Sequence, residues 1–384
     1  MNKILNIKDT CTGCGACVNI CAKNALSLEY DNEGFYYPSL CTEKCVECGM
    51  CEKVCPVLNE TLSTKIPCIE AYMLKSIDKD VIFKSTSGGA FTIFANYILK
   101  MGGIVFASRY NYETNKLEVS NSDKYPISDF RKSKYMESFV GKSFFYIKKE
   151  LQTGRKVLFV GTPCEAKGLK AYIPSKLQDK LIIVDFVCHG VPSNKHHTEY
   201  KLWLEKRIKK KIVYLDFRPK DFGWGKIFYH YRTNSEEKFI PGHDSYFYHA
   251  FQHSYFLRRS CYTCNRSTFS GADITIGDFW GIKKYDPQRA DKEGISVCIC
   301  RNAKGVTFLK SLDDVENNIV QLPLNAVDYI FSDRSNDNSF NYVPREEFLH
   351  NLLHYGYMGA VKRIYWKQMY LTRFKQFVKK IIKL

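Results

Sequence analysis

Eight cysteines near the start of the chain repeat one spacing twice, and this spacing is the strongest chemical signal in the sequence. Each run has the form C-x2-C-x2-C-x3-C, and the second run ends in Cys55-Pro56. Thiolates are soft ligands, and four of them suit the corners of an iron–sulfur cube. In this motif the fourth cysteine of each run ligates the other cluster. The spacing therefore predicts two [4Fe-4S] clusters, the first held by Cys11, Cys14, Cys17 and Cys55 and the second by Cys45, Cys48, Cys51 and Cys21.

Glycines between these cysteines fit the same interpretation. Gly13, Gly15 and Gly49 supply the backbone freedom that a tight wrap around a cluster needs. Zinc knuckles use paired C-x2-C units and do not need the longer run twice. A disulfide framework needs a secreted context, and the first ten residues lack the apolar stretch of a signal peptide. We expect residues 1–60 to fold around metal as a ferredoxin-like module, followed by a polar linker.

Four further cysteines, in the second half of the chain, could form a third site. Residues 156–160 and 181–186 are apolar runs that predict buried strands, and a cysteine follows each of them. Ligands of open α/β sheets lie at the carboxyl ends of the strands. Spacing alone leaves a third cluster, core thiols and nucleophiles open. The candidates are Cys164, Cys188, Cys261 and Cys264. Cys41, Cys68, Cys298 and Cys300 have no assigned partner, and the last two are expected to be core thiols.

Ser87-Gly88-Gly89 precedes a predicted helix. Apolar residues recur at helical spacing through residues 91–99, and Gly102-Gly103 ends the pattern. Backbone N–H groups and the helix dipole at such a start favour a phosphate. A simple capping turn explains the same three residues equally well.

Length and charge limit the function classes. The chain has 384 residues, 45% of them hydrophobic, enough for two or three domains. No run approaches the roughly 18 apolar residues of a membrane span. Sixteen cysteines in a chain without a secretion signal indicate redox chemistry in a reducing cytoplasm. The net charge of +17 fits an acidic partner such as a ferredoxin, and no nucleic-acid-binding module is present, so we expect no nucleic acid.

Several ordered motifs resemble the beta-subunit family of coenzyme F-420 hydrogenases and dehydrogenases, which also includes flavin-dependent reductases of chlorophyll metabolism. The resemblance covers roughly residues 67–330. The motifs are S-G-G-A-F-T (87–92), S-K-Y-M-E-S (133–138), G-T-P-C-E-A-K-G (161–168), V-C-H-G (187–190), C-Y-T-C (261–264) and D-I-T-I-G-D-F-W-G (273–281). Members of this family hold FAD and a cubane cluster, often with ferredoxin clusters fused at the amino terminus.

The resemblance implies roles for residues at matching positions. Cys164, Cys188, Cys261 and Cys264 match the family's cubane ligands, and Ser87, Gly88 and Gly89 match a loop beside FAD. A second flavin-contacting segment matches Ser133, Lys134, Tyr135 and Ser138. Lys134 could hold a phosphate or the flavin edge that becomes negative on reduction, and His189 could donate a proton to a substrate. A solvated lysine and a structural histidine are the alternatives. Asp278 and Trp280 are expected to shape the wall of the cluster or flavin site.

The fold class that follows is a multidomain α+β or α/β protein, with a bacterial-type 2[4Fe-4S] ferredoxin module fused to an α/β flavin- and cluster-binding domain. The expected parts are residues 1–60, an FAD-binding part at 67–150, a third-cluster part at 151–335 and a basic amphipathic helical tail at 345–384. The tail either lies on an anionic membrane at the inner face or packs on protein.

The expected function is that of a cytoplasmic iron–sulfur flavoprotein oxidoreductase. Its electrons come from a ferredoxin or another redox protein and pass between the clusters and FAD to a two-electron acceptor. Relatives of this fused type often accompany surface-polysaccharide synthesis, which suggests a small-molecule or sugar-linked substrate, and use of the deazaflavin coenzyme stays open. The alternative is a non-catalytic electron-transfer subunit of a larger complex.

Overall fold

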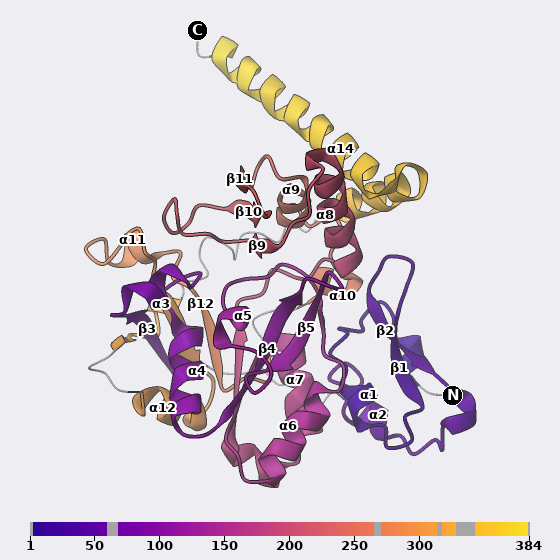
Figure 1. The fold of residues 1–384 in the computed structure, drawn as a ribbon, viewed down its shortest axis with the longest axis vertical. Coiled ribbons are helices and arrows are strands. Elements are labelled where there is room, and N and C mark those ends of the chain that lie inside the picture. Colours follow the sequence, from indigo (N-terminus) through magenta and orange to yellow (C-terminus); the bar gives the residue numbers. More distant parts are fainter. Residues whose placement is uncertain (1–2, 60–67, 265–269, 313–316, 328–341, 383–384) are drawn as a thin grey trace.

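The computed structural model describes residues 3–59, 68–264, 270–312, 317–327 and 342–382. The amino-terminal module lies beside one end of a large mixed sheet, and the carboxyl-terminal helix projects from the top of the view (Figure 1). The module contains one hairpin and two short helices, each of which lies within a cysteine run and carries its third cysteine. Its elements are η1 (Lys3–Asn6), α1 (Ala16–Ile20), β1 (Leu26–Tyr30), β2 (Tyr36–Leu40), η2 (Thr42–Lys44) and α2 (Met50–Lys53).

The described strands after the module form one large sheet and one small one. In the large sheet β12, β8, β7 and β4 are parallel, and β13, β3 and β14 pair antiparallel to their neighbours. Strand β5 is antiparallel to β4 and parallel to β6. The order across the sheet is β14 (Asn317–Leu322), β3 (Glu70–Ser76), β13 (Ser296–Cys300), β12 (Ile274–Asp278), β8 (Leu181–Phe186), β7 (Val157–Gly161), β4 (Ile104–Asn111), β5 (Lys116–Asn121) and β6 (Ser138–Phe139). The small antiparallel sheet is β11 (Glu237–Pro241), β10 (Phe228–Arg232) and β9 (Tyr214–Asp216).

Helices cover both faces of the large sheet, because its central strands are apolar on both sides. Along β7, Leu158 and Val160 pack against α4 and α12, whereas Val157 and Phe159 pack against α6 and α7. The helices of the described chain are α3 (Lys79–Phe83), α4 (Ala90–Lys100), α5 (Ile127–Phe130), α6 (Ser143–Gln152), α7 (Pro163–Tyr172), η4 (Ser175–Lys180), α8 (Asn194–Ile208), α9 (Tyr246–Gln252), α10 (Arg259–Tyr262), α11 (Ile282–Tyr285), α12 (Ala303–Lys310) and α14 (Tyr342–Ile382).

The expected parts 67–150 and 151–335 share this sheet. Strand β3 lies between β14 and β13, and β4 pairs with β7, so strands from both ranges are interleaved. Strands β4 and β5 form an antiparallel hairpin. Helix α12 is followed by the antiparallel edge strand β14.

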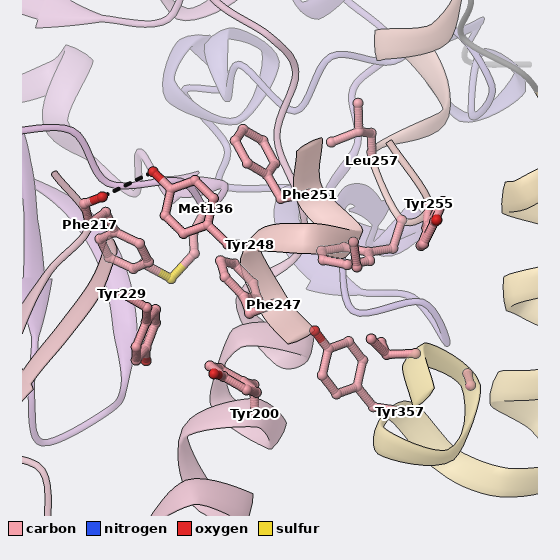
Figure 2. Close-up of a cluster of buried hydrophobic side chains, with 14 of the residues drawn as sticks. Met136, Tyr200, Phe217, Tyr229, Phe247, Tyr248, Phe251, Tyr255, Leu257 and Tyr357 are labelled. Carbon is pink, nitrogen blue, oxygen red and sulfur yellow. Dashed lines mark hydrogen bonds between the residues drawn. The ribbon is translucent and has the colours of Figure 1, made fainter. Parts of the chain in front are cut away.

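A second apolar core lies between the large sheet and the carboxyl-terminal helix. Its rings come from α8, α9, the small sheet and α14, and include Tyr200, Phe217, Tyr229, Phe247 and Tyr357 (Figure 2). The Tyr248 hydroxyl donates to the carbonyl oxygen of Phe217 across 3.0 Å, which satisfies a buried phenol inside this core. This core anchors the start of the tail to the rest of the protein.

Helix α14 is not straight. Gly356 has φ 65° and ψ 177°, so two helical pieces meet there. In the second piece Val361, Ile364 and Tyr365 are buried in the aromatic core, whereas Tyr370 is 80% exposed. The interpretation that the tail packs on protein is therefore confirmed for residues 361–365.

Candidate functional site

The first predicted cluster site is a cavity in the amino-terminal module. The sulfur-bearing residues Cys11, Cys14, Cys17 and Cys55 all line it. Its other walls are mostly apolar and include Ile4, Ile7, Leu28, Pro38, Pro56 and Val57. These are the four cysteines that the crossed ligation pattern assigns to one cluster, so their arrangement fits a [4Fe-4S] group.

The electrostatics of this cavity disfavour bare thiolates. Burial, with the neighbouring Cys55 and Cys11 acting in the same direction, raises the pKa of Cys14 to about 12. Burial also raises the pKa of Cys17 well above its usual range, with Cys14, Cys11 and Cys55 acting in the same direction. Sulfurs this close to one another repel as anions. Coordination to iron removes that cost, because a cationic metal deprotonates its thiol ligands.

Glycines position the two cysteine runs in the same way. Gly15 and Gly49 are the N-cap residues of α1 and α2, with φ of 74° and 69°, a left-handed conformation that favours glycine. The internal repeat of the sequence is thus also a repeat of backbone geometry. A side chain at Gly13 would lie 2.8 Å from the guanidinium of Arg258, so this glycine also makes room for an arginine of the second half.

The second predicted cluster site lies nearer the surface. Cys48 is exposed and Cys45 is half-buried, whereas Cys51 is buried in the small core of the module. The Cys21 sulfur accepts a hydrogen bond from the Ala25 amide at 3.2 Å. Joint ligation of one cluster by these four cysteines stays a prediction.

The third group of cysteines forms where β7 and β8 end. These strands are parallel neighbours, so Cys164 at the start of α7 and Cys188 after β8 lie at the same edge of the sheet. Burial raises the pKa of Cys164 well above its usual range, and the nearby Cys188 and Cys261 add to the rise. Cys264 interacts with Lys167 of α7. The structure therefore brings together residues that are far apart in sequence, whereas their ligation of a cluster stays a prediction.

All sixteen cysteines lie in the described part of the chain, and none of them forms a disulfide. Within the same residues, no group of three or more His, Cys, Asp or Glu side chains is arranged to hold a single metal ion. Cys298 and Cys300 are fully buried on β13 beneath α4 and α12, as expected of core thiols.

Helix α7 connects the first and third cysteine groups. It carries Cys164 at its start, and one turn later Gly168 faces the first cavity. A Cβ atom at Gly168 would lie only 2.8 Å from the sulfur of Cys14. The two groups are therefore separated by little more than one turn of helix.

The two segments expected to contact a flavin meet in the structure. The hydroxyl of Thr86 accepts a hydrogen bond from the Ser133 amide at 3.0 Å, and the two hydroxyl oxygens are 3.3 Å apart. Lys220 is buried between them and donates to the carbonyl oxygens of Ser87 and Ile82, at 2.5 and 2.8 Å. The predicted loops thus share one site with a lysine that we had not predicted.

Two lysines of this site are largely shielded from solvent and form no ion pair with a described carboxylate. Lys134 donates to the carbonyl oxygens of Arg131 and Lys132 at 2.7 and 3.3 Å, and neither Lys134 nor Lys220 forms an ion pair with a described carboxylate. Burial lowers the pKa of both lysines to about 7. Lys134 is half-buried, and its role toward a flavin or a phosphate stays a prediction. An anion bound here would relieve the cost of the buried charge.

A network of hydrogen bonds and one ion pair lies beside the same site. Arg218 is buried and contacts Asp278 and the Tyr135 hydroxyl, each at 3.3 Å. The indole of Trp224 donates to Asp278 at 3.2 Å and stacks on Trp280. Asp278 and Trp280 therefore belong to this network, and their role in the wall of a cluster or flavin site stays a prediction. Sequence reasoning missed Arg218, Lys220 and Trp224, although the Gly- and Pro-containing stretch 216–225 interrupts the strand pattern there.

Other predicted residues have structural partners. Gly88 cannot carry a side chain, because a Cβ atom would lie 2.2 Å from the Leu74 carbonyl oxygen, and Gly89 is a left-handed N-cap with φ 97°. The Ser87 hydroxyl donates to the carbonyl oxygen of Ile295 at 2.7 Å. The fold by itself accounts for these three residues, and their role toward a cofactor stays a prediction.

Ser138 and His189 lie away from Lys134. Ser138 donates to Glu165, the capping-box residue beside Cys164. The His189 ring is 3.1 Å from the Ser254 hydroxyl and lies edge-on to Phe251, which in turn packs against Tyr135. These rings connect the third cysteine group with the cationic site, and a catalytic role for His189 stays a prediction.

Comparisons with known proteins identify two regions of the chain. Residues 154–321 match the model for the carboxyl-terminal region of the coenzyme F420 hydrogenase/dehydrogenase beta subunit. These residues therefore match the family that the sequence motifs resemble. Residues 10–59 match the 4Fe-4S dicluster domain, so the amino-terminal module is an iron–sulfur domain. Both candidate flavin-contacting segments lie outside these matched ranges.

Two relatives are similar over most of the chain. The sequence is 22% identical over 283 residues to the F component of the F(420)H(2) dehydrogenase of Methanosarcina mazei, which covers 70% of this chain and 75% of the relative. A chain of the F420-reducing [NiFe] hydrogenase complex from Methanosarcina barkeri is 16% identical with a TM-score of 0.47, covering 75% of this chain and 94% of that one. No helix in the described residues is long and apolar enough to cross a membrane.

Proposed function

We propose that this chain is an iron–sulfur flavoprotein oxidoreductase that links a one-electron protein donor or acceptor to a two-electron substrate. The observation that carries the proposal is the gathering of Cys11, Cys14, Cys17 and Cys55 around one cavity, directly against the helix that carries Cys164. When bound, the clusters would supply single electrons and FAD would convert them into hydride transfer.

The gradient of burial suggests where a protein partner docks. Cys48 is exposed, whereas Cys14 is buried against α7, so a redox partner such as a ferredoxin can approach the second site more closely than the first. Helix α7 also carries Cys164, and all four cysteines of the third group are half-buried. The proposed electron path therefore runs from the exposed second site through the buried first site to the third group.

The cationic site is our candidate for FAD. Lys134 and Lys220 hold charge that no described carboxylate pairs, and they lie where the loops of Thr86 and Ser133 meet. A diphosphate, or the flavin edge that becomes negative on reduction, would supply the missing counter-charge. Lys134 is the candidate to hold this charge, whereas His189 lies near the cysteine group and is a candidate proton donor.

The physiological acceptor has two candidate classes. The relatives' names point to the deazaflavin coenzyme F420 as a substrate, and the expected link to surface-polysaccharide synthesis points to a sugar-linked one. A second candidate function is that of a non-catalytic electron-transfer subunit. The similar Methanosarcina mazei protein favours it, because that protein is itself one component of a dehydrogenase with several subunits.

Anaerobic purification with quantified iron and flavin tests the proposal. We expect about twelve iron atoms and one FAD per chain. Reduction should then be followed with ferredoxin, a nicotinamide and coenzyme F420 in parallel. Iron near eight would refute the third cluster. Full iron with no flavin would favour the electron-transfer role over the flavoenzyme.

A further inference from the structure

Arg258 is the largest fully buried side chain of the described protein, and it touches the first cysteine group from the second half of the chain. Its Nε atom donates to the carbonyl oxygen of Cys11 at 2.7 Å, and one Nη2 hydrogen bond reaches the carbonyl oxygen of Tyr36 at 2.7 Å. Nη2 also lies 3.7 Å from the Cys11 sulfur. Nη1 pairs with the carboxylate of Glu137, which is itself buried.

The backbone of Arg258 belongs to the third cysteine group. Its carbonyl oxygen accepts a hydrogen bond from the Cys261 amide at 2.9 Å, at the start of α10. The side chain of Arg258 therefore contacts Cys11 of the first site, whereas its backbone contacts Cys261 of the third group. Gly13, which would clash with the guanidinium if it carried a side chain, keeps this position open.

We propose that Arg258 is a positioning residue that raises the reduction potential of the first site, which makes that site a better electron acceptor than the second. The inference rests on the proposed cluster in the first cavity. An N–H···S hydrogen bond and a nearby cation both stabilise the added electron, and hydrogen bonds to the sulfurs are a known means of setting such potentials. Burial strengthens the effect, because solvent does not screen the charge.

Glu137 limits this effect. Its carboxylate pairs with Nη1 of Arg258 beside Gly13 and partly neutralises the charge that acts on Cys11. Removing the Arg258 charge and removing the Glu137 charge should therefore shift the potential of the first site in opposite directions. If this ion pair were purely structural, the two substitutions would not shift the reduction potential in opposite directions.

The chain offers a matched control in the next residue. Arg259 pairs with Asp9 and Glu33 at 3.2 and 3.0 Å, so it also bridges the two halves of the protein. Its side chain is 41% exposed, and solvent screens its charge. Arg259→Gln thus changes the net charge by the same amount as Arg258→Gln and leaves the buried guanidinium in place.

The experiment is an anaerobic redox titration of the full-length, iron-loaded protein, followed by electron paramagnetic resonance at about pH 8.5, where Glu137 is ionised. Iron content is measured first for each variant. We expect Arg258→Gln to lower the first-site potential, Glu137→Gln to raise it, and Arg259→Gln to change neither site. Arg258→Lys should give a smaller decrease, because lysine keeps the charge and loses the planar fork of donors.

Each outcome decides the question. The inference is overturned if Arg258→Gln keeps its iron and the wild-type potential, or if the Arg258 and Glu137 variants shift in the same direction. Should Arg258→Gln lose iron, Glu137→Gln decides, and an unchanged or lowered potential in it overturns the inference. Wild-type protein without iron at the first site would instead refute the proposed function.

Discussion

Replacing Gly168 with alanine tests whether the first cavity and helix α7 must fit together as closely as the structure shows. An added Cβ atom would lie 2.8 Å from the Cys14 sulfur, 3.0 Å from the Cys14 Cβ atom and 3.4 Å from the Ala16 Cβ atom. Atoms in contact are normally separated by about 3.5–4.0 Å. The sulfur would therefore have to move by roughly 0.7 Å or more.

Two explanations of Gly168, helix preference and close packing, predict opposite changes in stability for Gly168→Ala. In an unconstrained helix, alanine is more favourable than glycine by about 1 kcal/mol. Overpacking a core costs typically about 1–3 kcal/mol. Metal sites tolerate deviations of only about 0.2 Å in ligand distances, so the displaced Cys14 would no longer fit its place in a cluster. We expect Gly168→Ala to lose about four iron atoms per chain and to keep the other clusters.

Iron and sulfide analysis of anaerobically purified protein measures this loss, and electron paramagnetic resonance shows which cluster is missing. Lys170→Ala is the control, because it also places alanine on α7, at a half-buried position two residues further on. Full iron in Gly168→Ala, with an unchanged spectrum of the first cluster, would refute the close fit. A gain in thermal stability with full iron would show that the helix preference alone governs this position.

Two further predictions concern the cationic site and the tail. Affinity for FAD should fall as the pH rises above about 7, by up to about tenfold per pH unit for each lysine, because Lys134 and Lys220 lose protons there and the anion loses its counter-charge. Fluorescence titration of flavin measures this, Lys220→Met should flatten the dependence, and a pH-independent affinity contradicts the assignment. If the tail binds membranes, a chain ended after Lys367 should sediment less with anionic liposomes than the full chain and keep residues 361–365 in the core. Equal sedimentation would exclude membrane binding by the removed residues.

Sequence patterns predicted the structural features that depend on residues close together in the chain. The apolar run of residues 156–160 predicts a buried strand, and β7 indeed packs on both faces. The positions of Cys164 and Cys188 after two such strands predicted that they would meet, since parallel strands end at one edge. The cysteine spacing likewise predicted which four cysteines lie together in the first cavity.

Contacts between distant segments could not be predicted in this way. Arg258 reaches Cys11 across 247 positions of the chain, and nothing in the sequence near either residue records that contact. Lys220 lies in the Gly- and Pro-containing stretch 216–225, and only the folded chain shows that it reaches the loop of Ser87. Ser138 matches the same family segment as Lys134, whereas in the structure its hydroxyl donates to Glu165, beside Cys164.

The wall shared by Cys14 and Gly168 also constrains how the protein matures. Cys14 and Ala16 are part of the same apolar core as α6 and α7, so the first cavity is closed on one side by the second half of the chain. A folded chain therefore offers little room for an iron–sulfur donor at this wall. Cluster insertion must come before, or together with, the docking of residues 1–59, and chains that miss this step would expose both an empty metal site and a patch of apolar core to the cell's quality control.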